Sequence, residues 1–338
     1  MKILHLTLGL GNGGAEGALY RLICFDQRNQ HIVISIMGDG VYGAKLRKLG
    51  VEVYSFDVPQ GKVPLSIFFK LFKLFRKVKP DVLQTWLYHA DVLGGVIGKL
   101  AGIQNIYWGI RHSNLSPSLN SRATLLLAKT SSHLSSFIPA SIISCSHKAT
   151  EVHIEIGYEA SKFVTIANGY DLDNLNYSSS LRKKLRSYWS IDEDCFVFGM
   201  VGRWNPQKNH ANLIEAVALL SERASFKFCC VLVGPSITNE NTELLSVICN
   251  NGVKHLVKLA GPTNHVAGVM SAFDVSVLPS SGEAFPNVVA ESMACSTPVI
   301  ATDVGDARLI VGEAGWIVTP NNAKALAEAM SSSFELYQ

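Results

Sequence analysis

Short apolar runs alternate with longer segments of helical spacing along almost the whole chain, and this pattern predicts a repeating order of strands and helices. In the first half, strands are expected at residues 2–8, 31–37, 51–56, 80–85, 105–109, 141–145 and 163–166. In the second half, they are expected at 195–201, 227–233, 257–259, 275–278, 298–301 and 316–318. Helices are expected at 15–24, 62–79, 90–102, 123–134 and 211–220, and another begins near Ala323.

This order indicates an α/β protein with two tandem, doubly wound Rossmann-like domains. The first domain is expected to cover residues 1–170 and the second 195–338, with a polar linker at 171–194 that contains a short basic helix. In such sheets, ligands bind at the carboxyl ends of the strands. Two of them in tandem therefore predict a ligand cleft between the domains.

The composition fits two cores of ordinary size, since the 338 residues are 48% hydrophobic and 17% charged. No N-terminal signal pattern is found, and no apolar stretch approaches the roughly 18 residues of a membrane-spanning helix. The seven cysteines form no C-x-x-C pair, which indicates reduced thiols and neither a zinc site nor a disulfide framework. We therefore expect a cytoplasmic or peripheral protein.

Positive charge is concentrated in the first half of the chain. Residues 1–168 carry 18 Lys and Arg against 10 Asp and Glu, whereas residues 169–338 carry 12 against 17. The expected helix at 62–79 contributes most, because Phe and Leu alternate there with Lys and Arg at helical spacing. Two compatible interpretations remain open: the Phe face packs on the sheet, or the helix lies on an anionic membrane surface. The basic region lacks the aromatic spacing of an RNA-binding motif, so no nucleic-acid partner is expected.

The most informative segment is 280–295, which joins the expected strand 275–278 to a short helix. Pro286 lies near the first turn of that helix, where unpaired backbone N–H groups and the helix dipole favour a phosphate. Glu283 precedes the helix, and Glu291 lies about two turns inside it. A phosphate-binding helix flanked by two carboxylates fits a sugar nucleotide.

Two cations follow the expected strand 195–201. Arg203 and Lys208 are separated by an Asn-Pro turn, so both can converge on one point. A diphosphate leaving group gains negative charge as its bond to a sugar breaks, and cations at that point would stabilise it. The alternative is an Arg and a Lys on the surface at the start of a helix.

A glycine cluster at 9–14 matches G-x-G-x-x-G between a strand and a helix, and Asp39 follows near the end of the second strand. Taken alone, the cluster predicts a dinucleotide site. Glycines also permit a turn without a ligand, or a turn close to another phosphate or sugar. The second complete domain, which carries its own anion site, favours the last of these interpretations.

Three further polar groups carry weaker signals. Asp171-Leu172-Asp173 is a D-x-D, the pattern with which some transferases hold a divalent cation, but at a domain junction we expect a turn. His89 and Asp91, after the fourth strand, are candidates for contact with an acceptor; the alternative is polar groups at a helix start. No G-x-S-x-G, H-E-x-x-H or Walker sequence occurs.

Together these motifs resemble those of the retaining family 4 glycosyltransferases, which have the GT-B fold. The resemblance covers essentially the whole chain, and the set is more specific than any one motif. The amino-acid sequence at 84–91, 108–114 and 282–287 is similar to that of bacterial members that build surface polysaccharides or lipid-linked glycans. The shared motifs are Gly13-Gly14-Ala15-Glu16, Pro80-Asp81-Val82, Ile166-Ala167-Asn168-Gly169-Tyr170-Asp171, Gly202-Arg203 with Lys208, Glu283 with Glu291, and Pro298-Val299-Ile300-Ala301-Thr302.

The resemblance implies a donor site made largely by the second domain. Arg203 and Lys208 would hold the donor diphosphate, Glu291 would hydrogen-bond the ribose and Glu283 would contact the sugar. The base would be bound mainly by backbone atoms, here from Gly234 and residues 259–263. The remaining donor-binding candidates are Gly13 and Gly14 on the phosphate side and the backbone of Phe285, Pro286, Asn287 and Val288.

The resemblance also implies the reaction. His112 stands where the family has a His near the transferring sugar carbon, so it would orient the sugar and help to stabilise charge. In these enzymes the departing phosphate oxygen takes the acceptor proton on the same face, which requires neither paired carboxylates nor a metal. The expectation is a retaining, metal-independent hexosyltransferase without a cofactor, working from a nucleotide sugar to a glycan or lipid-linked oligosaccharide at the inner face of the cytoplasmic membrane.

Two other functions remain open. One is a NAD-dependent oxidoreductase built on the glycine cluster at 9–14, and the other is a non-catalytic member of a polysaccharide assembly complex. The chain also departs from the family, whose members usually continue with a further helix or two beyond the one that starts near Ala323. Because this sequence stops at Gln338, the second domain is expected to be truncated or abbreviated at its C-terminus.

Overall fold

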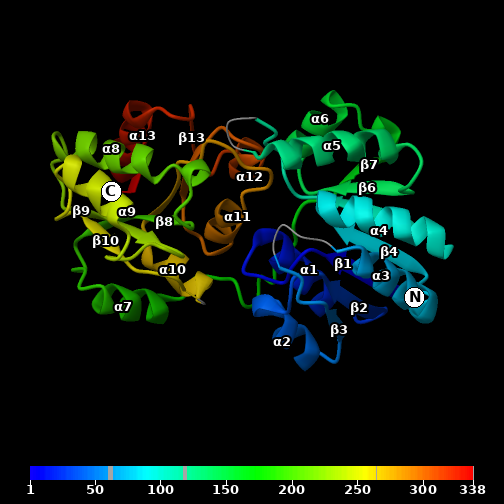
Figure 1. Ribbon diagram of the computed structural model, residues 1–338. Helices are drawn as coiled ribbons and strands as arrows, with labels where there is room; N and C mark the ends of the chain where they lie inside the picture. The colour runs from blue at the N-terminus through cyan, green and yellow to red at the C-terminus, as the bar shows by residue number, and fades with distance from the viewer. Residues whose placement is uncertain (60–63, 117–119, 264, 338) are drawn as a thin grey trace. The chain divides into compact units, whose positions relative to one another are not determined.

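The computed structural model describes residues 1–59, 64–116, 120–263 and 265–337. The chain divides into two compact units, Met1–Gly169 and Tyr170–Gln338. Each unit consists of a parallel sheet covered by helices (Figure 1). Residues 62 and 63 of the helix expected at 62–79 lie outside the described residues.

The first unit contains a seven-stranded parallel sheet in the order β3-β2-β1-β4-β5-β6-β7. The order reverses at β1, which pairs with β2 on one side and with β4 on the other. In a doubly wound sheet this reversal marks the place where ligands bind, at the carboxyl ends of the strands. The strands are β1 (Lys2–Thr7), β2 (Gln30–Ser35), β3 (Glu52–Ser55), β4 (Val82–Trp86), β5 (Ile106–Ile110), β6 (Ser141–Ser144) and β7 (Phe163–Thr165).

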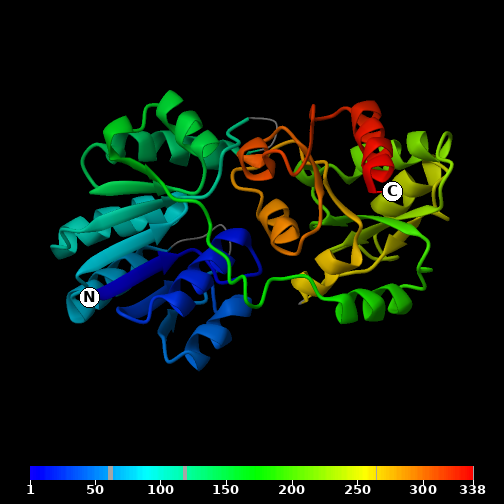
Figure 2. The same ribbon diagram turned by 180° about the vertical axis from the view of Figure 1, so that it is seen from behind.

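Helices cover both faces of this sheet. On one face, α3 packs against α4 and α4 against α5, and the three form a continuous layer (Figure 1). The view from behind shows α1 and α2, in blue, on the other face (Figure 2), where Leu19, Ile23 and Leu46 join the core. The helices are α1 (Gly14–Phe25), α2 (Gly40–Lys48), α3 (Leu65–Val78), α4 (Tyr88–Ala101), α5 (Arg122–Ser135), α6 (His147–Glu155) and the short η1 (Ala160–Lys162).

The second unit contains a six-stranded parallel sheet in the order β10-β9-β8-β11-β12-β13, with the reversal between β8 and β11. Phe198, Leu213 and Leu232 are among the residues of its largest core cluster. Its strands are β8 (Phe196–Val201), β9 (Phe228–Val233), β10 (Val257–Leu259), β11 (Val275–Leu278), β12 (Val299–Thr302) and β13 (Gly315–Val318). Its helices are α7 (Ser179–Tyr188), η2 (Pro206–Lys208), α8 (His210–Ser221), α9 (Thr242–Asn250), α10 (Val266–Ala272), α11 (Asn287–Ala294), α12 (Ala307–Val311) and α13 (Ala323–Tyr337).

The segment expected as a linker, 171–194, is part of the second unit. Its basic helix is α7, which packs on α10. Arg182 and Arg186 reach the buried Asp274 with N–O distances of 2.5 and 2.6 Å, and Asp274 also accepts a hydrogen bond from the Val197 amide. The basic residues of α7 therefore hold the helix to the starts of β8 and β11, which sequence spacing alone did not indicate.

Every expected strand is present, and the two doubly wound sheets confirm the predicted fold class. Several short helices were not predicted, among them α2 and α6. The buried residues of α2 are Gly43 and Leu46, and those of α6 are Ala149 and His153. Because these helices bury so few large side chains, their sequences show little apolar periodicity, which explains why the helices were not predicted.

Candidate functional site

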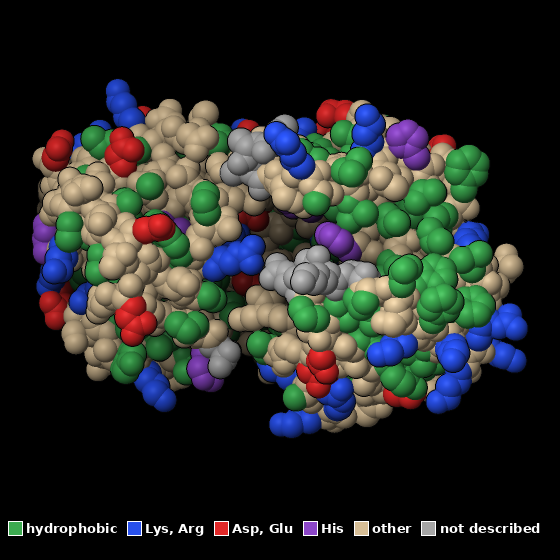
Figure 3. Space-filling model, viewed as in Figure 1, with side chains coloured by type: hydrophobic (Ala, Val, Ile, Leu, Met, Phe, Trp, Pro, Cys, Tyr) green, Lys and Arg blue, Asp and Glu red, His purple; other side chains and the backbone are tan. Residues whose placement is uncertain are grey.

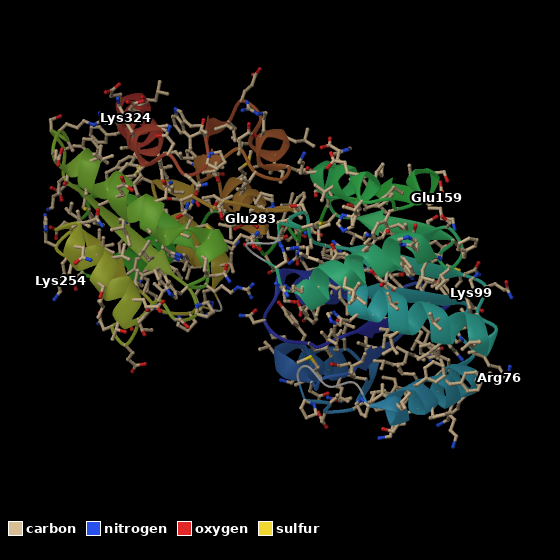
Figure 4. All side chains as sticks on the ribbon, turned by 45° about the horizontal axis from the view of Figure 1, so that its top comes forward. Arg76, Lys99, Glu159, Lys254, Glu283 and Lys324 are labelled. Atoms are coloured by element: carbon tan, nitrogen blue, oxygen red, sulfur yellow. The ribbon has the colours of Figure 1, made fainter. Side chains whose placement is uncertain are left out.

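The centre of the candidate site in the second unit is an ion pair between two loops. Lys208 lies at the end of η2, in the loop after β8, and Glu283 lies in the loop after β11 (labelled in Figure 4). Lys208 Nζ is 2.6 Å from Glu283 Oε1, and Ser280 Oγ donates to the same oxygen at 2.7 Å. Both charged side chains are mostly buried, with 23% and 12% of their surfaces exposed. The two sequence motifs predicted to share one site are therefore in direct contact.

Several bonds hold these loops together. The Gln207 side chain donates to the Gly282 carbonyl, and the Ser281 amide donates back to the Gln207 carbonyl at 2.9 Å. The loop after β12 packs equally closely against the loop that carries Glu283. Gly305 in that loop has a φ of +55°, and a Cβ there would lie 2.3 Å from the Ala284 carbonyl oxygen. Only glycine fits this position. The backbone on either side of Glu283 is thus fixed by the loops after β8 and β12.

Helix α11 begins directly after this loop, with Pro286 as its N-cap. The positive end of the helix dipole therefore lies beside the Lys208–Glu283 pair. Tyr170 Oη donates to Asn287 Oδ1 at 2.5 Å and fixes the side chain of the first helical residue. Phe285, Val288 and Glu291 are partly exposed on this loop and helix, and Glu291 lies in the second turn.

Arg203 is the exposed cation of the site. It follows β8 and forms no ion pair with a carboxylate in the described part of the chain. The next residue, Trp204, donates its ring N–H to Glu243, and its ring centroid lies 5.2 Å from that of the buried His210. Burial lowers the pKa of His210 to about 4, so this imidazole is neutral at pH 7. Arg203 and Lys208 are therefore the positive charges that this loop presents.

The loops after β8, β9 and β10 meet at Gly234. Its φ is +153°, and a Cβ there would lie 2.2 Å from the Gly202 carbonyl oxygen. The Gly234 amide donates to the Gly261 carbonyl, and the Gly202 amide to the Val233 carbonyl, both at 2.8 Å. The strand ends expected to bind the base are thus joined through their backbones, and base contact itself stays a prediction.

In the first unit, Gly13 and Gly14 form the N-terminus of α1, where Gly13 is the N-cap and provides no side-chain cap. Asp39, which the dinucleotide hypothesis needs for a ribose, forms an ion pair with Arg47. The carboxylate is therefore already engaged within α2 and its N-cap.

His112 lies two residues beyond β5 and is partly exposed. Its Nε2 is 3.1 Å from Asn120 Oδ1, and the Asn120 amide nitrogen donates to the Asn114 and Ser116 carbonyls. Those two bonds assign the Asn120 oxygen to His112, so a neutral His112 carries its proton on Nε2 and a lone pair on Nδ1.

The sequence analysis did not predict a role for Arg111 or for the residues that contact it. The guanidinium carbon lies 4.8 Å from the centroid of the Trp86 ring, and Arg111 also bonds to Asn168. These residues end or follow β4, β5 and β7, at the carboxyl edge where ligands bind. The signal available in the sequence was the Arg directly before His112.

A buried chain of side chains fixes Trp86. Its indole N–H donates to His5 Nδ1 at 3.4 Å, so His5 carries its own proton on Nε2, which lies 3.0 Å from His31 Nδ1. His31 Nε2 in turn lies 3.2 Å from Asp26 Oδ2. Burial lowers the pKa of His5 to about 3, which keeps the ring neutral. The orientation of Trp86, and hence of Arg111, is therefore set by residues of β1 and β2.

The two acceptor candidates lie in different environments. His89 is exposed in the first turn of α4. Asp91 is fully buried: Thr85 Oγ1 lies 2.6 Å from its Oδ1, and burial raises its pKa to about 8. The prediction that Asp91 contacts an acceptor is wrong for this structure, because its carboxyl group points into the core between β4 and α4. Asp171 of the D-x-D sequence accepts hydrogen bonds from Asp173 and Asn174, which confirms the expected turn.

Comparison with known proteins identifies what the chain is similar to. Residues 195–335 match the family model described as Glycosyl transferases group 1. The "UDP-Gal:alpha-D-GlcNAc-diphosphoundecaprenol alpha-1,3-galactosyltransferase" of Escherichia coli is 25% identical over 269 residues, which cover 77% of this chain and 68% of that protein. The "N,N'-diacetylbacillosaminyl-diphospho-undecaprenol alpha-1,3-N-acetylgalactosaminyltransferase" of Campylobacter jejuni is 24% identical, with coverage of 90% and 82%. The crystal structure of Anabaena Alr3699/HepE in complex with UDP-glucose is 25% identical and has a TM-score of 0.86, with coverage of 100% and 91%.

Proposed function

The chain is a glycosyltransferase of the GT-B fold with a group 1 domain at residues 195–335, and from this premise we propose that it transfers a sugar, with retention, from a nucleotide diphosphate to a lipid-linked glycan. The names of the E. coli and C. jejuni relatives both specify a sugar on diphospho-undecaprenol, and the Anabaena structure contains UDP-glucose. The observation that carries the proposal is the Lys208–Glu283 contact beside the N-terminus of α11.

In the proposed donor site, positive and negative side chains bind different parts of the donor. Lys208, Arg203 and the N-terminus of α11 would take the diphosphate, whose negative charge increases as the bond to the sugar breaks. Glu283, held by Ser280 as well as by Lys208, would accept hydrogen bonds from sugar hydroxyls. Glu291 would bind the ribose, and the backbone of 285–288 would line the sugar and phosphates. The positive charge in this proposal comes from the chain, and no metal takes part.

The first unit would provide the acceptor side. The acceptor hydroxyl would attack the anomeric carbon on the face from which the phosphate departs, and its proton would pass to the departing phosphate oxygen. His112, with its Nε2 proton directed to Asn120, would hold the sugar in place. Gly13 and Gly14 would lie near the phosphates, and His89 stays a candidate for acceptor contact.

None of the helices in the described part of the chain is long and apolar enough to cross a bilayer. A lipid-linked acceptor nevertheless resides in a membrane, so we propose that the chain works as a peripheral protein on the inner face of the cytoplasmic membrane. The basic helix α3 is the element that we expect to make that contact.

A transfer assay tests the proposal. Purified protein is incubated with bacterial membranes and radiolabelled UDP-, GDP- or ADP-sugars, and labelled lipid is then extracted into organic solvent. We expect label in the lipid fraction, and we expect His112→Ala to reduce transfer at least about 100-fold while the dissociation constant for the nucleoside diphosphate stays within about threefold.

Two outcomes would redirect the assignment. A protein that binds a sugar nucleotide but neither hydrolyses nor transfers it would be a non-catalytic component of an assembly. Binding of NAD(H) together with no binding of any nucleoside diphosphate would support the oxidoreductase, which neither the comparisons nor the pairing of Asp39 with Arg47 favours.

A further inference from the structure

The residue that joins β4 to α4 has a strained backbone. Leu87 precedes the first residue of α4 and has a φ of 71° and a ψ of 158°. This region of conformational space suits glycine almost exclusively, because a Cβ clashes there with the backbone. The other non-glycine residues with a positive φ in the described part of the chain are all polar. A large apolar side chain in this conformation therefore requires an explanation.

The residues on either side of Leu87 fix this conformation. Trp86 is 1% exposed and donates its indole N–H to Nδ1 of His5 on β1. Tyr88 is 6% exposed, and its Oη lies 2.5 Å from Nε2 of His153 on α6. Both neighbours are thus bonded to other elements of the unit, and the backbone between them cannot relax without breaking those bonds.

The main chain of Leu87 is bonded as well. Its amide donates to the Gly109 carbonyl of β5 at 3.0 Å, and its carbonyl accepts from the Asp91 amide of α4 at 2.9 Å. Strand β5 ends one residue after Gly109, and Arg111 and His112 follow. Leu87 therefore lies beside the strand end that carries His112, the residue proposed to hold the transferred sugar.

A turn selected for its shape alone would contain glycine, which adopts this conformation without a steric cost. A leucine raises the equilibrium constant for unfolding, through its backbone alone, by about fivefold or more. Its side chain is only partly buried, whereas those of Trp86 and Tyr88 are buried. Packing within the unit thus uses only part of the side chain. Strain of this kind occurs where the strained residue serves a ligand site.

Polar groups adjoin Leu87 along the chain and across the sheet edge. His89, two residues further on, is exposed, and His112 is partly exposed. On the face shown in Figure 3, a histidine of the first unit is exposed among hydrophobic side chains. A sugar ring presents hydroxyl groups together with an apolar face of C–H groups. Sites for such ligands combine apolar side chains with a few placed polar groups.

We propose that Leu87 determines acceptor specificity: its side chain, held at the end of β4 by the strained backbone, packs against the apolar face of the acceptor sugar. The acceptor is favoured over the donor because the proposed contacts to the donor diphosphate and ribose belong to the second unit. The inference deepens the proposed function and rests on it, since only a transferase has an acceptor site.

Steady-state kinetics of Leu87 variants test this contact. The transfer assay is run with a radiolabelled sugar nucleotide that wild type accepts. Varying the amount of membranes gives the apparent KM for the acceptor, and varying the sugar nucleotide gives the KM for the donor. We expect Leu87→Ala and Leu87→Gly to raise the acceptor KM about tenfold and to leave the donor KM within about twofold, because an apolar contact to the acceptor alone is lost.

Denaturant unfolding tests the strain separately. Both variants lack the leucine side chain, but only Leu87→Ala keeps a Cβ at a positive φ. The equilibrium constant for unfolding of Leu87→Gly should therefore be about fivefold or more below that of Leu87→Ala.

Two variants control the kinetics, and circular dichroism checks that each is folded. Leu87→Met retains a large apolar side chain and should keep the acceptor KM within about threefold of wild type. Leu22 is 41% exposed in the last turn of α1, away from the carboxyl edge, and Leu22→Ala should change neither KM.

An unchanged acceptor KM in Leu87→Ala, while wild type transfers sugar, would overturn this inference and leave the proposed function intact. An equal rise of the donor KM would also overturn it, because the side chain would then contact the donor. Equal stability of Leu87→Gly and Leu87→Ala would show that no strain is stored at this position. Absence of transfer by wild type would remove the proposed function, and the acceptor contact with it.

Discussion

At the scale of single residues, burial determines which polar groups can meet a substrate. Asp91 has a sequence position typical of a ligand contact. Its Oδ1, however, accepts a hydrogen bond from Thr85 Oγ1 at 2.6 Å and lies 3.4 Å from the Gly109 amide nitrogen. The carboxyl group therefore joins β4, α4 and β5 just before the segment that carries Arg111 and His112. Its pKa of about 8 means that it is mostly protonated at pH 7.

Replacing Asp91 with Asn should remove a pH dependence of stability. The pKa of Asp91 rises from 3.8 to about 8 on folding, so the folded state retains a proton that the unfolded chain has lost. The stabilisation from this proton is full below pH 4 and disappears as the pH rises to 8. Relative to that of wild type, the free energy of unfolding of Asp91→Asn should therefore increase by about 1 kcal/mol for each pH unit between pH 5 and 8.

Denaturant unfolding at several pH values measures this gain. The exposed Asp173 provides the control, and Asp173→Asn should follow wild type throughout. A constant difference between Asp91→Asn and wild type from pH 5 to pH 9 would show that Asp91 is ionised in the folded protein.

The proximity of site residues could be predicted where each residue follows a strand at one edge of a sheet, but not where it depends on a chain of buried side chains. Lys208 and Glu283 were expected in one site because each follows a strand at the same edge of a sheet, and the structure places them in contact. The support of Arg111 by Trp86, His5 and His31 involves β1, β2 and β4. No sequence spacing encodes that chain, since lone buried histidines are ordinary core residues.

At the scale of elements, the strands were predicted well because they are short and apolar. Helices with a broad buried face, such as α8 with Leu213, Ile214 and Val217, were predicted too. Helix α7 was predicted as a helix but misplaced in a linker, because its arginines look solvated in sequence although Arg186 is buried against Asp274. A cation that forms a buried ion pair cannot be distinguished from a surface cation by composition alone.

The loop that carries Glu283 depends on Gly305. An alanine there would adopt an unfavourable φ of +55° and would place its Cβ against the Ala284 and Glu283 carbonyls. We expect Gly305→Ala to lower the free energy of unfolding by about 3 kcal/mol, of which about 1 kcal/mol is the conformational cost and the rest the displacement of the loop. Nucleoside diphosphate binding should weaken with it.

Gly102, after α4, is the control, since it adopts the left-handed conformation with a φ of +89° and a Cβ there would meet nothing within 4 Å. Gly102→Ala should cost only the conformational term, and it should leave nucleotide affinity unchanged. If thermal unfolding and nucleotide titration give the same values for both variants, the tight packing of the Glu283 loop has no role in the site.

At the scale of the whole molecule, the two units present different side chains at the carboxyl edges of their sheets. The first presents His112 and Arg111 at the carboxyl edge of its sheet and a basic, partly apolar helical layer on one face. The second presents Lys208, Glu283, Arg203 and the start of α11. This division fits an acceptor held at a membrane by one unit and a water-soluble donor held by the other, and the cleft expected between them stays a prediction.

The most direct test of the account is a calorimetric titration of UDP, GDP and ADP into wild type and Lys208→Ala. A charged contact to phosphate is worth about 1.5–3 kcal/mol, so we expect wild type to bind at least one of the three and Lys208→Ala to bind it at least about tenfold more weakly. The double variant K208A with E283Q, which leaves no unbalanced carboxylate, should fold like wild type and still bind weakly. Unchanged affinity in both variants, or no binding of any nucleoside diphosphate by wild type, would contradict the donor site assigned to the second unit.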